Sequence, residues 1–233
     1  MPDRTRTEST RTEGARTEST RTEGARTERT PARAGRPRGS SRAMLEEAAA
    51  ELFLEQGYAG TTVEDITRRA GVSRNTFFNY FPAKSDLLWA DVDAGLAELP
   101  RALADCPYGL GVTDAVRHAL HQVAAGFGPG RVPWALTQAD LMGTRGVLEA
   151  SGLSRMMKQA DLVSRFVAER AGSDAEAGRD LAGRCFAMAV LAAAVAAAGV
   201  WAAAGVSRGN LAPYVDAGIA PACAGYRDAL GAG

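Results

Sequence analysis

The stretch TTVEDITRRAGVSRNTFFNYF (residues 61–81) predicts two short helices joined by a tight turn. Thr62 with Asp65 three residues later is close to the capping box that opens a helix. Gly71 can adopt the positive φ that ends this helix, and Ser73 can cap the next one. Two helices joined in this way and packed on a preceding helix form a helix-turn-helix, whose second helix enters the major groove of DNA.

Helical patterning extends to both sides of this stretch. Before it, Ser41 can cap a helix that Gly57 ends, with apolar residues at helical spacing: Leu45, Ala48, Ala49, Leu52 and Phe53. After Pro82, glycine and proline punctuation predicts helices near 83–103, 113–127, 132–143, 146–171, 174–204 and 210–229. The sequence has no run of alternating β-branched residues. We therefore expect an all-α fold, with an N-terminal helix-turn-helix head of three helices followed by a C-terminal helical bundle.

Charge is distributed unevenly along the chain, although 27 Lys and Arg balance 27 Asp and Glu. Residues 1–43 carry 11 Arg and 6 acidic residues, so the rest of the chain is net acidic. The segment from Ile66 to Lys84 has no acidic residue and four cations: Arg68, Arg69, Arg74 and Lys84. Such a cationic strip on an otherwise acidic body is typical of a phosphate-binding surface.

Residues 1–39 are predicted to form a disordered basic tail. The decapeptide RTESTRTEGA at 6–15 recurs unchanged at 16–25, and it holds no large apolar residue that could bury surface. A Pro/Arg/Gly-rich linker ends the tail. In this linker Arg36 and Arg38 have two interpretations: contacts in the DNA minor groove, or a solvated basic linker that adds only salt-dependent affinity.

The cysteines and the apolar segments exclude several classes of protein. Cys106, Cys185 and Cys223 are widely spaced and form no C-x-x-C pair, so neither a disulfide framework nor a zinc site is expected. Residues 185–206 carry no charge over a length that could span a membrane. Because Ala and Gly dominate that segment, we interpret it as a helix packed at a helix–helix interface, with no membrane partner. The N-terminus has no secretory signal, so a cytoplasmic location is expected.

In residues and spacing, LFLEQGYAGTTVEDITRRAGVSRNTFFNYFPAKSDLL (52–88) resembles the DNA-binding domain of the TetR family of bacterial regulators. The shared motifs are the G-Y-x-x-T-T start, the A-G-V-S turn, the aromatic-rich recognition helix and the F-P-x-K step into the next helix. The resemblance implies a DNA-binding domain at 40–84 and a ligand-binding and dimerisation domain at 85–233. In this family the last two helices form a four-helix interface between two copies.

The resemblance also implies which residues contact double-stranded DNA. Arg74 and Asn75 stand where the family reads bases, since Arg suits guanine O6 and N7 and Asn suits adenine. Phe78 stands where the family commonly has Tyr, so it keeps an apolar contact and loses a hydroxyl–phosphate bond. The full expected set around the turn is Thr62, Ser73, Arg74, Asn75, Thr76, Phe78, Asn79, Tyr80 and Lys84.

Phosphate contacts are expected from Thr62, Tyr80 and Lys84, with Thr62 donating from its hydroxyl or its backbone N–H. Thr76 is placed to touch a thymine methyl, whereas the neighbouring Phe77 and Phe81 are expected in the core. The sequence carries no nucleophile elbow, P-loop, dinucleotide fingerprint or H-E-x-x-H motif, so no catalytic site and no cofactor are expected.

An apolar effector pocket is expected in the C-terminal domain, although Met and aromatic residues at helical spacing equally suit a plain core. The expected lining residues are Trp89, Trp134, Leu141, Met142, Met156, Met157, Phe166 and Met188. Residues 73–99, with F-F-x-Y-F and W-x-D-x-D, are similar to the actinobacterial mycofactocin-system type of regulator, which implies an acyl-CoA or other lipid-like effector. His118 and His121 share a helix face with Asp114, which we interpret as a surface cluster rather than a metal site.

Together these features predict a homodimeric, ligand-responsive transcriptional regulator. In this family such a regulator is most often a repressor. We expect it to bind a palindromic operator and to leave it when a small apolar effector binds. Two alternatives stay open. One is a transcriptional activator or an effector-independent DNA-binding protein, which a footprint with and without small molecules would distinguish. The other is a small-molecule-binding or enzymatic helical domain, or a purely structural module, with a DNA-binding head attached.

Overall fold

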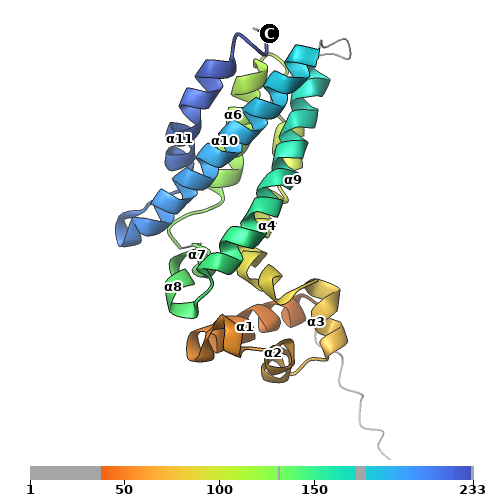
Figure 1. Cartoon of the computed structure of the whole chain (residues 1–233), viewed down its shortest axis with the longest axis vertical. Helices are drawn as coiled ribbons and strands as arrows, with labels where there is room; N and C mark the ends of the chain where they lie inside the picture. The colour runs from red at the N-terminus through yellow and green to blue at the C-terminus, as the bar shows by residue number, and fades with distance from the viewer. Residues whose placement is uncertain (1–37, 131, 172–176, 232–233) are drawn as a thin grey trace, which may run out of the picture. The chain divides into compact units, whose positions relative to one another are not determined.

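The computed structural model describes residues 38–130, 132–171 and 177–231, which lie in one unit, Arg36–Gly233 (Figure 1). Every regular element in these ranges is helical, which confirms the all-α prediction. Arg36 and the decapeptide repeat lie outside the described residues, as does the side chain of Arg38. The elements are α1 (Arg38–Gly60), α2 (Val63–Ala70), α3 (Arg74–Tyr80), η1 (Lys84–Trp89), α4 (Ala90–Leu96), α5 (Leu99–Ala104), α6 (Val112–Ala125), α7 (Trp134–Thr137), α8 (Ala139–Met142), α9 (Arg145–Ala171), α10 (Ala177–Ala203), η2 (Gly205–Ser207) and α11 (Ala212–Tyr226).

Helices α1, α2 and α3 form the predicted head, and one face of each helix supplies its core. The apolar residues at helical spacing are buried: Leu45, Ala49, Phe53, Ile66, Phe77 and Phe81. The same buried cluster continues into Leu87 and Leu88 of η1, and it takes in Ala135, Met142 and Leu148 from farther along the chain. The domain boundary expected after Lys84 therefore falls inside one contiguous cluster, because later helices help to cover the head.

Two predicted helices are divided in the structure. The helix expected over 83–103 is divided into η1, α4 and α5. Pro100 in the first turn of α5 has no N–H to continue the preceding helix, which accounts for the break between α4 and α5. The helix expected over 132–143 breaks at Gln138 into α7 and α8. Gly57, where a helix end was expected, has φ 77° and interrupts the helical conformation inside α1.

The C-terminal bundle consists of α6, α9, α10 and α11, with α10 packed against both α9 and α11 (Figure 1). Gly218 of α11 allows a close approach, since a Cβ there would lie 3.1 Å from Ala197 Cβ and 3.2 Å from the carbonyl oxygen of Ala193. The Ala-rich and Gly-rich composition thus serves tight packing of α11 on α10. Trp201 ends this packed face, is buried, and donates from Nε1 to the carbonyl oxygen of Gly209 at 3.1 Å.

The segment Leu181–Ala203 of α10 is long and apolar enough to cross a membrane by length and composition, and 33% of its window is buried within the chain. Its buried side packs against α9 and α11. Its other side carries Leu181, Val195 and Val200, which are 64%, 60% and 63% exposed. A single chain therefore leaves an apolar face of α10 uncovered.

Candidate nucleic-acid interface

The first helix of the helix-turn-helix begins at the predicted capping box. The Asp65 N–H donates to Thr62 Oγ1 at 3.1 Å, and Asp65 Oδ2 accepts from both the Thr62 hydroxyl (2.6 Å) and the Thr62 backbone N–H (3.0 Å). These bonds, the hydroxyl bond foremost, lower the pKa of the Asp65 carboxyl. Both Thr62 donors expected on a phosphate are thus already used by Asp65, and a phosphate bond from Thr62 would have to replace one of them.

The turn between the two helices also forms as predicted. Gly71 has φ 66° and ψ 32°, the left-handed conformation, and its N–H donates to the carbonyl oxygen of Arg68 at 3.2 Å. Ser73 then caps α3, since its Oγ accepts from the Thr76 N–H at 3.0 Å. Because these bonds are local, residue type and spacing are sufficient to predict where α3 begins.

Helix α3 has one buried and one exposed face. Phe77 and Phe81 are buried, which confirms that they belong to the core. The opposite face presents exposed side chains, namely Arg74, Asn75, Phe78 and Asn79, whereas Thr76 and Tyr80 are half-buried. Phe78 is 44% exposed and meets Phe77 edge to face at a centroid distance of 5.2 Å. An exposed face with a cation, two amides and an aromatic ring offers the hydrogen-bond and methyl contacts used for base reading.

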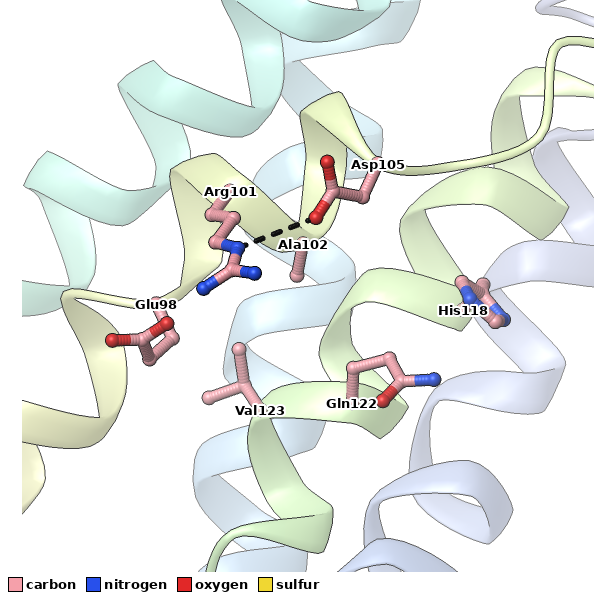
Figure 2. A pocket seen from close by; sticks show the side chains of 7 residues that line it. All are labelled: Glu98, Arg101, Ala102, Asp105, His118, Gln122 and Val123. Carbon is pink, nitrogen blue, oxygen red and sulfur yellow. Dashed lines mark hydrogen bonds and ion pairs between the residues drawn. The ribbon is translucent and has the colours of Figure 1, made fainter.

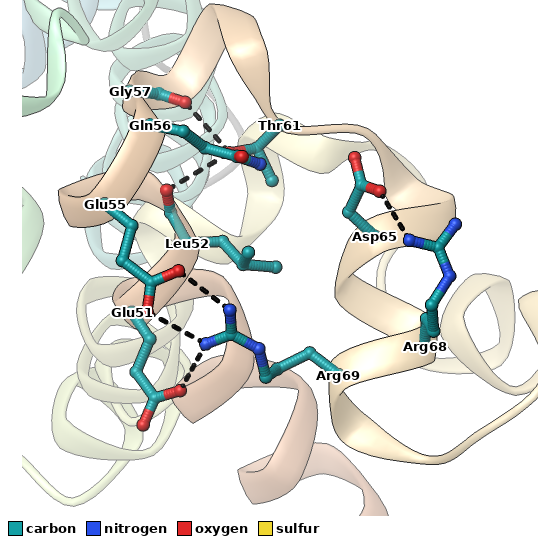
Figure 3. Close-up of polar contacts among 9 residues, drawn as sticks. All are labelled: Glu51, Leu52, Glu55, Gln56, Gly57, Thr61, Asp65, Arg68 and Arg69. Atoms are coloured by element: carbon teal, nitrogen blue, oxygen red, sulfur yellow. Dashed lines mark hydrogen bonds and ion pairs between the residues drawn. The ribbon is translucent and has the colours of Figure 1, made fainter.

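The two arginines of α2 form ion pairs with carboxylates that lie outside the segment Ile66–Lys84 (Figure 3). Arg69 donates to Glu51 at 2.9 Å and to Glu55 at 2.7 Å, both on α1, and the bond to Glu55 lowers the pKa of the Glu55 carboxyl. Arg68 donates to Asp65 at 3.0 Å. These carboxylates therefore neutralise part of the positive charge that the segment Ile66–Lys84 carries.

Lys84, expected at a phosphate, lies at the junction of α1 and α2. Its Nζ donates to the carbonyl oxygens of Tyr58 (2.7 Å) and Thr61 (2.6 Å) and lies 3.9 Å from the centre of the Tyr58 ring. Burial lowers the pKa of Lys84 and raises that of Tyr58. An ammonium group has three N–H donors, so one remains for a phosphate. Lys84 thus has a structural role that the sequence analysis did not anticipate.

Thr61 also stabilises the junction of α1 and α2 (Figure 3). Its side chain is buried, and its hydroxyl lies 2.9 Å from the carbonyl oxygen of Gly57 and 3.2 Å from Gln56 Nε2, which donates to it. The hydroxyl thereby satisfies a carbonyl at the point where Gly57 interrupts α1. The second Thr of the G-Y-x-x-T-T motif caps α2, and the first fastens α2 to α1.

Arg74, the expected base-reading cation, is held by a residue that the sequence analysis missed. Its Nη1 donates to Glu64 Oε1 of α2 at 2.5 Å, and its Cζ lies 5.5 Å from the centre of the Phe78 ring. The side chains of Arg74 and Glu64 are 63% and 49% exposed. Glu64 comes two residues before Ile66, so a search for acids inside the strip could not find it.

The residues expected to line an effector pocket do not gather around one cavity in the described structure. Leu141 and Met157 are 70% and 44% exposed, and Met142 is buried in the cluster under the head. The remaining five are half-buried against one hydrophobic cluster or the other: Trp89, Trp134, Met156, Phe166 and Met188. Ordinary helix packing accounts for this burial.

A recess of about 480 Å³ lies between α5 and α6 (Figure 2), lined by Glu98, Arg101, Ala102, Asp105, His118, Gln122 and Val123. It holds none of the expected pocket residues, and Arg101 donates to Asp105 within it at 3.4 Å. His118 faces this recess, whereas His121 Nδ1 lies 2.6 Å from Asp216 Oδ2 of α11. No group of three His, Cys, Asp or Glu in the described ranges could hold a metal ion.

Two family models match the sequence. Residues 45–90 match the model described as bacterial regulatory proteins, tetR family. Residues 110–227 match the model described as the MftR C-terminal domain. The two matches cover most of the residues that the structure describes, one over the head and η1 and the other over the helical bundle.

Two curated relatives match part of this chain. The "Putative mycofactocin biosynthesis transcriptional regulator MftR" of Mycobacterium tuberculosis is 35% identical over 89 residues, which are 38% of this chain and 45% of that protein. The transcriptional regulator EthR of the same species is 38% identical over 72 residues, 30% of this chain and 33% of that protein. The matched stretch thus spans less than half of either relative.

Among solved structures, Thermus thermophilus FadR, described as a TetR family transcriptional repressor in complex with lauroyl-CoA, is 24% identical. The match covers 78% of this chain and 92% of that one, with a TM-score of 0.45. A TetR-like transcriptional regulator from Rhodococcus is 19% identical over 81% of this chain and 98% of that one, with a TM-score of 0.42.

Proposed function

Because the chain belongs to the TetR family of bacterial regulatory proteins, we propose that it is a DNA-binding transcriptional regulator. Its most frequent form in the family is a repressor that binds a palindromic operator as a homodimer and leaves it when a small effector binds. The observation that carries this proposal is the exposed face of α3, with Arg74, Asn75, Phe78 and Asn79 opposite the buried Phe77.

On this proposal, Arg74 and Asn75 read base edges and Phe78 contacts a thymine methyl or a sugar. Ser73, Thr76, Asn79 and Tyr80 lie on or beside the same helix and serve the neighbouring backbone and base contacts. Lys84 contacts a phosphate with its third N–H, and Thr62 contacts one by exchanging a bond to Asp65 for a bond to the phosphate. Minor-groove contacts by the tail arginines, Arg36 and Arg38, belong to the same proposal.

The uncovered face of α10 supports the proposed homodimer. Three large apolar side chains, Leu181, Val195 and Val200, are exposed there among small alanines and glycines. Large apolar side chains exposed along one helix are typical of a protein–protein interface. Pairing two copies through α10 and α11 would cover this face and present two α3 helices to two half-sites one turn of DNA apart.

The effector is proposed to be small and apolar, an acyl-CoA or other lipid-like molecule, because the bundle matches the MftR-type C-terminal domain. On this proposal, the effector takes the space that two aromatic rings occupy in the described structure. Phe127 lies against Gly95 of α4, and Trp89 lies 3.2 Å from a Cβ placed on Gly152 of α9. We propose that the effector opens this packing, which would alter the contact of α9 with the head.

The relatives named above are transcriptional regulators, so we propose no catalytic reaction for this chain and a cytoplasmic location where its DNA is found. A transcriptional activator uses the same head and differs only in where its operator lies relative to the promoter. A footprint on the regulated promoter, with and without effector, separates these two forms.

Selection from a randomised DNA duplex library tests the proposed function. We expect the wild-type protein to enrich a palindrome of about 15–30 base pairs. Arg74→Ala should weaken binding to that palindrome by about 1–3 kcal/mol, the value of one bidentate guanine contact. Arg165→Ala, an exposed arginine of α9, is the matched control. Enrichment of no motif, with retention that depends on salt alone, would contradict the proposal.

A further inference from the structure

The Arg74–Glu64 pair differs from the other ion pairs of the head. Arg69 is tied back to α1 by two carboxylates, and Arg68 is tied to the cap of its own helix. Arg74 alone among these three arginines stands at the start of the recognition helix, and its carboxylate partner comes from α2. The pair therefore joins the two helices of the helix-turn-helix on the side that faces the expected DNA.

The contact fixes the guanidinium and leaves part of it open. Glu64 Oε1 takes a hydrogen from Nη1, and the Phe78 ring lies beside Cζ at 5.5 Å. A guanidinium group has five N–H donors in a rigid plane, so Nη2 and Nε stay available as a second edge. Two parallel donors of this kind match O6 and N7 of guanine. A side chain already held in one geometry loses less conformational entropy when it binds.

The Glu64 carboxylate also affects the binding of duplexes that offer Arg74 no matching base. Glu64 is about half exposed beside the reading cation, where phosphates would approach. Like charges repel, so Glu64 weakens binding to every duplex, and the loss is offset only where Arg74 gains a base contact. An exposed ion pair contributes little to folding, so the effect of Glu64 belongs mainly to DNA recognition.

We propose that Glu64 is a positioning and selectivity residue of the DNA-reading surface, which orients the Arg74 guanidinium over Phe78 and disfavours duplexes without a matching base. This inference rests on the proposed DNA-binding function. It predicts that removal of Glu64 makes the protein bind more DNA and distinguish fewer sequences.

The test uses the full chain and a library of randomised duplexes of roughly 30 base pairs, long enough for two half-sites. Wild-type protein, Glu64→Gln and Glu64→Ala are compared for base preference after selection and for retention of unselected library. Glu47→Gln, which removes one negative charge from an exposed position of α1, is the matched control. Thermal melting of each variant verifies that it is folded.

Glu64→Ala should lower the preference at the base pair read by Arg74 by at least about fivefold, since one bidentate contact loses its orientation. It should raise retention of unselected duplex by up to about fivefold, the scale of one exposed charge interaction. Glu64→Gln should raise retention equally but keep more of the base preference, because the amide oxygen can still accept from Arg74. Glu47→Gln should change neither measurement.

The inference is overturned if the wild type enriches a motif and Glu64→Ala enriches the same motif with unchanged preference and with retention no greater than that of Glu47→Gln. If the wild type enriches no motif, the proposed function itself fails, and the inference fails with it. The two failures are distinguished by the wild-type selection alone.

Discussion

The two carboxylate oxygens of Asp86 in η1 have different partners: Arg155 of α9 and the backbone N–H of Ala83, just before η1. Oδ1 accepts from Arg155 Nη2 of α9 at 2.8 Å, across 69 residues of sequence, and Oδ2 accepts from the Ala83 N–H at 2.9 Å. The same arginine also holds both oxygens of Asp93 of α4 at 2.8 Å and lies over Trp89 at 4.9 Å. Arg155 thus joins α9 to the segment that leaves the head, beside the bond from Trp89 Nε1 to Ser151 Oγ at 2.8 Å.

Removal of Arg155 should destabilise the protein. The Arg155 side chain is 15% exposed and its partners Asp86 and Asp93 are 24% and 41% exposed, so two carboxylates would lose a partly buried cation. For Arg155→Ala we expect a loss of about 2–3 kcal/mol in the free energy of unfolding, below the value for a fully buried pair because water screens part of the interaction. Urea denaturation measures it.

Arg165→Ala on the exposed side of α9 serves as the control and should change the free energy of unfolding by less than about 0.5 kcal/mol. Equal losses in the two variants would contradict the role given to Arg155.

The stability contributed by Asp65 should depend on pH. The Thr62 hydroxyl, the Thr62 N–H and Arg68 lower the pKa of the folded carboxyl below its unfolded value, near about 3.9. The contribution is therefore complete above that unfolded value and is lost as the pH falls through the lowered folded value. Urea denaturation should show Asp65→Asn less stable than wild type at neutral pH, with the difference shrinking in acid.

For comparison, Asp161→Asn on the exposed surface of α9 should show no such trend. A difference between wild type and Asp65→Asn that stays constant down to strongly acidic pH would contradict the ionised capping box.

Lys84→Met tests the two roles of Lys84 separately. Loss of the bonds to the carbonyl oxygens of Tyr58 and Thr61 should lower the free energy of unfolding by about 1–2 kcal/mol. If the third N–H contacts a phosphate as proposed, the slope of log affinity against log salt should become shallower by about 0.9 for each Lys84, which is about 1.8 for the homodimer. Lys158→Met, exposed on α9, is the control for both measurements. A loss of stability with an unchanged salt slope would leave Lys84 with a structural role only.

Val195→Glu should prevent dimerisation. Val195 lies on the uncovered face of α10, where a buried carboxylate without a partner would oppose contact between two copies. Sedimentation should give the mass of a dimer for the wild type and of a monomer for the variant, with weaker binding to a palindromic duplex. Val206→Glu, at an exposed position in η2, should stay dimeric. A dimeric Val195→Glu variant would place the interface elsewhere.

The sequence determined the local structure of the head. The capping box of Thr62 and Asp65, the left-handed Gly71 and the cap by Ser73 each involve atoms within a few residues of one another, so residue type and spacing are sufficient to predict them. The inward face of α3 follows from helical periodicity in the same way. Pro100, which has no N–H, likewise marks the break between α4 and α5 in the sequence.

Only the tertiary structure decided how the charges and the bulky apolar residues are used. Arg69 meets Glu55 across 14 residues of sequence, and Arg155 meets Asp86 across 69. Such pairs depend on how helices cross, which spacing along the chain does not encode. The three arginines of the cationic strip are consequently paired with carboxylates, Arg74 with Glu64, whereas Lys84 bonds to backbone carbonyl oxygens. Six of the apolar residues expected around an effector are divided between two cores, and Leu141 and Met157 are exposed, because packing between helices set their neighbours.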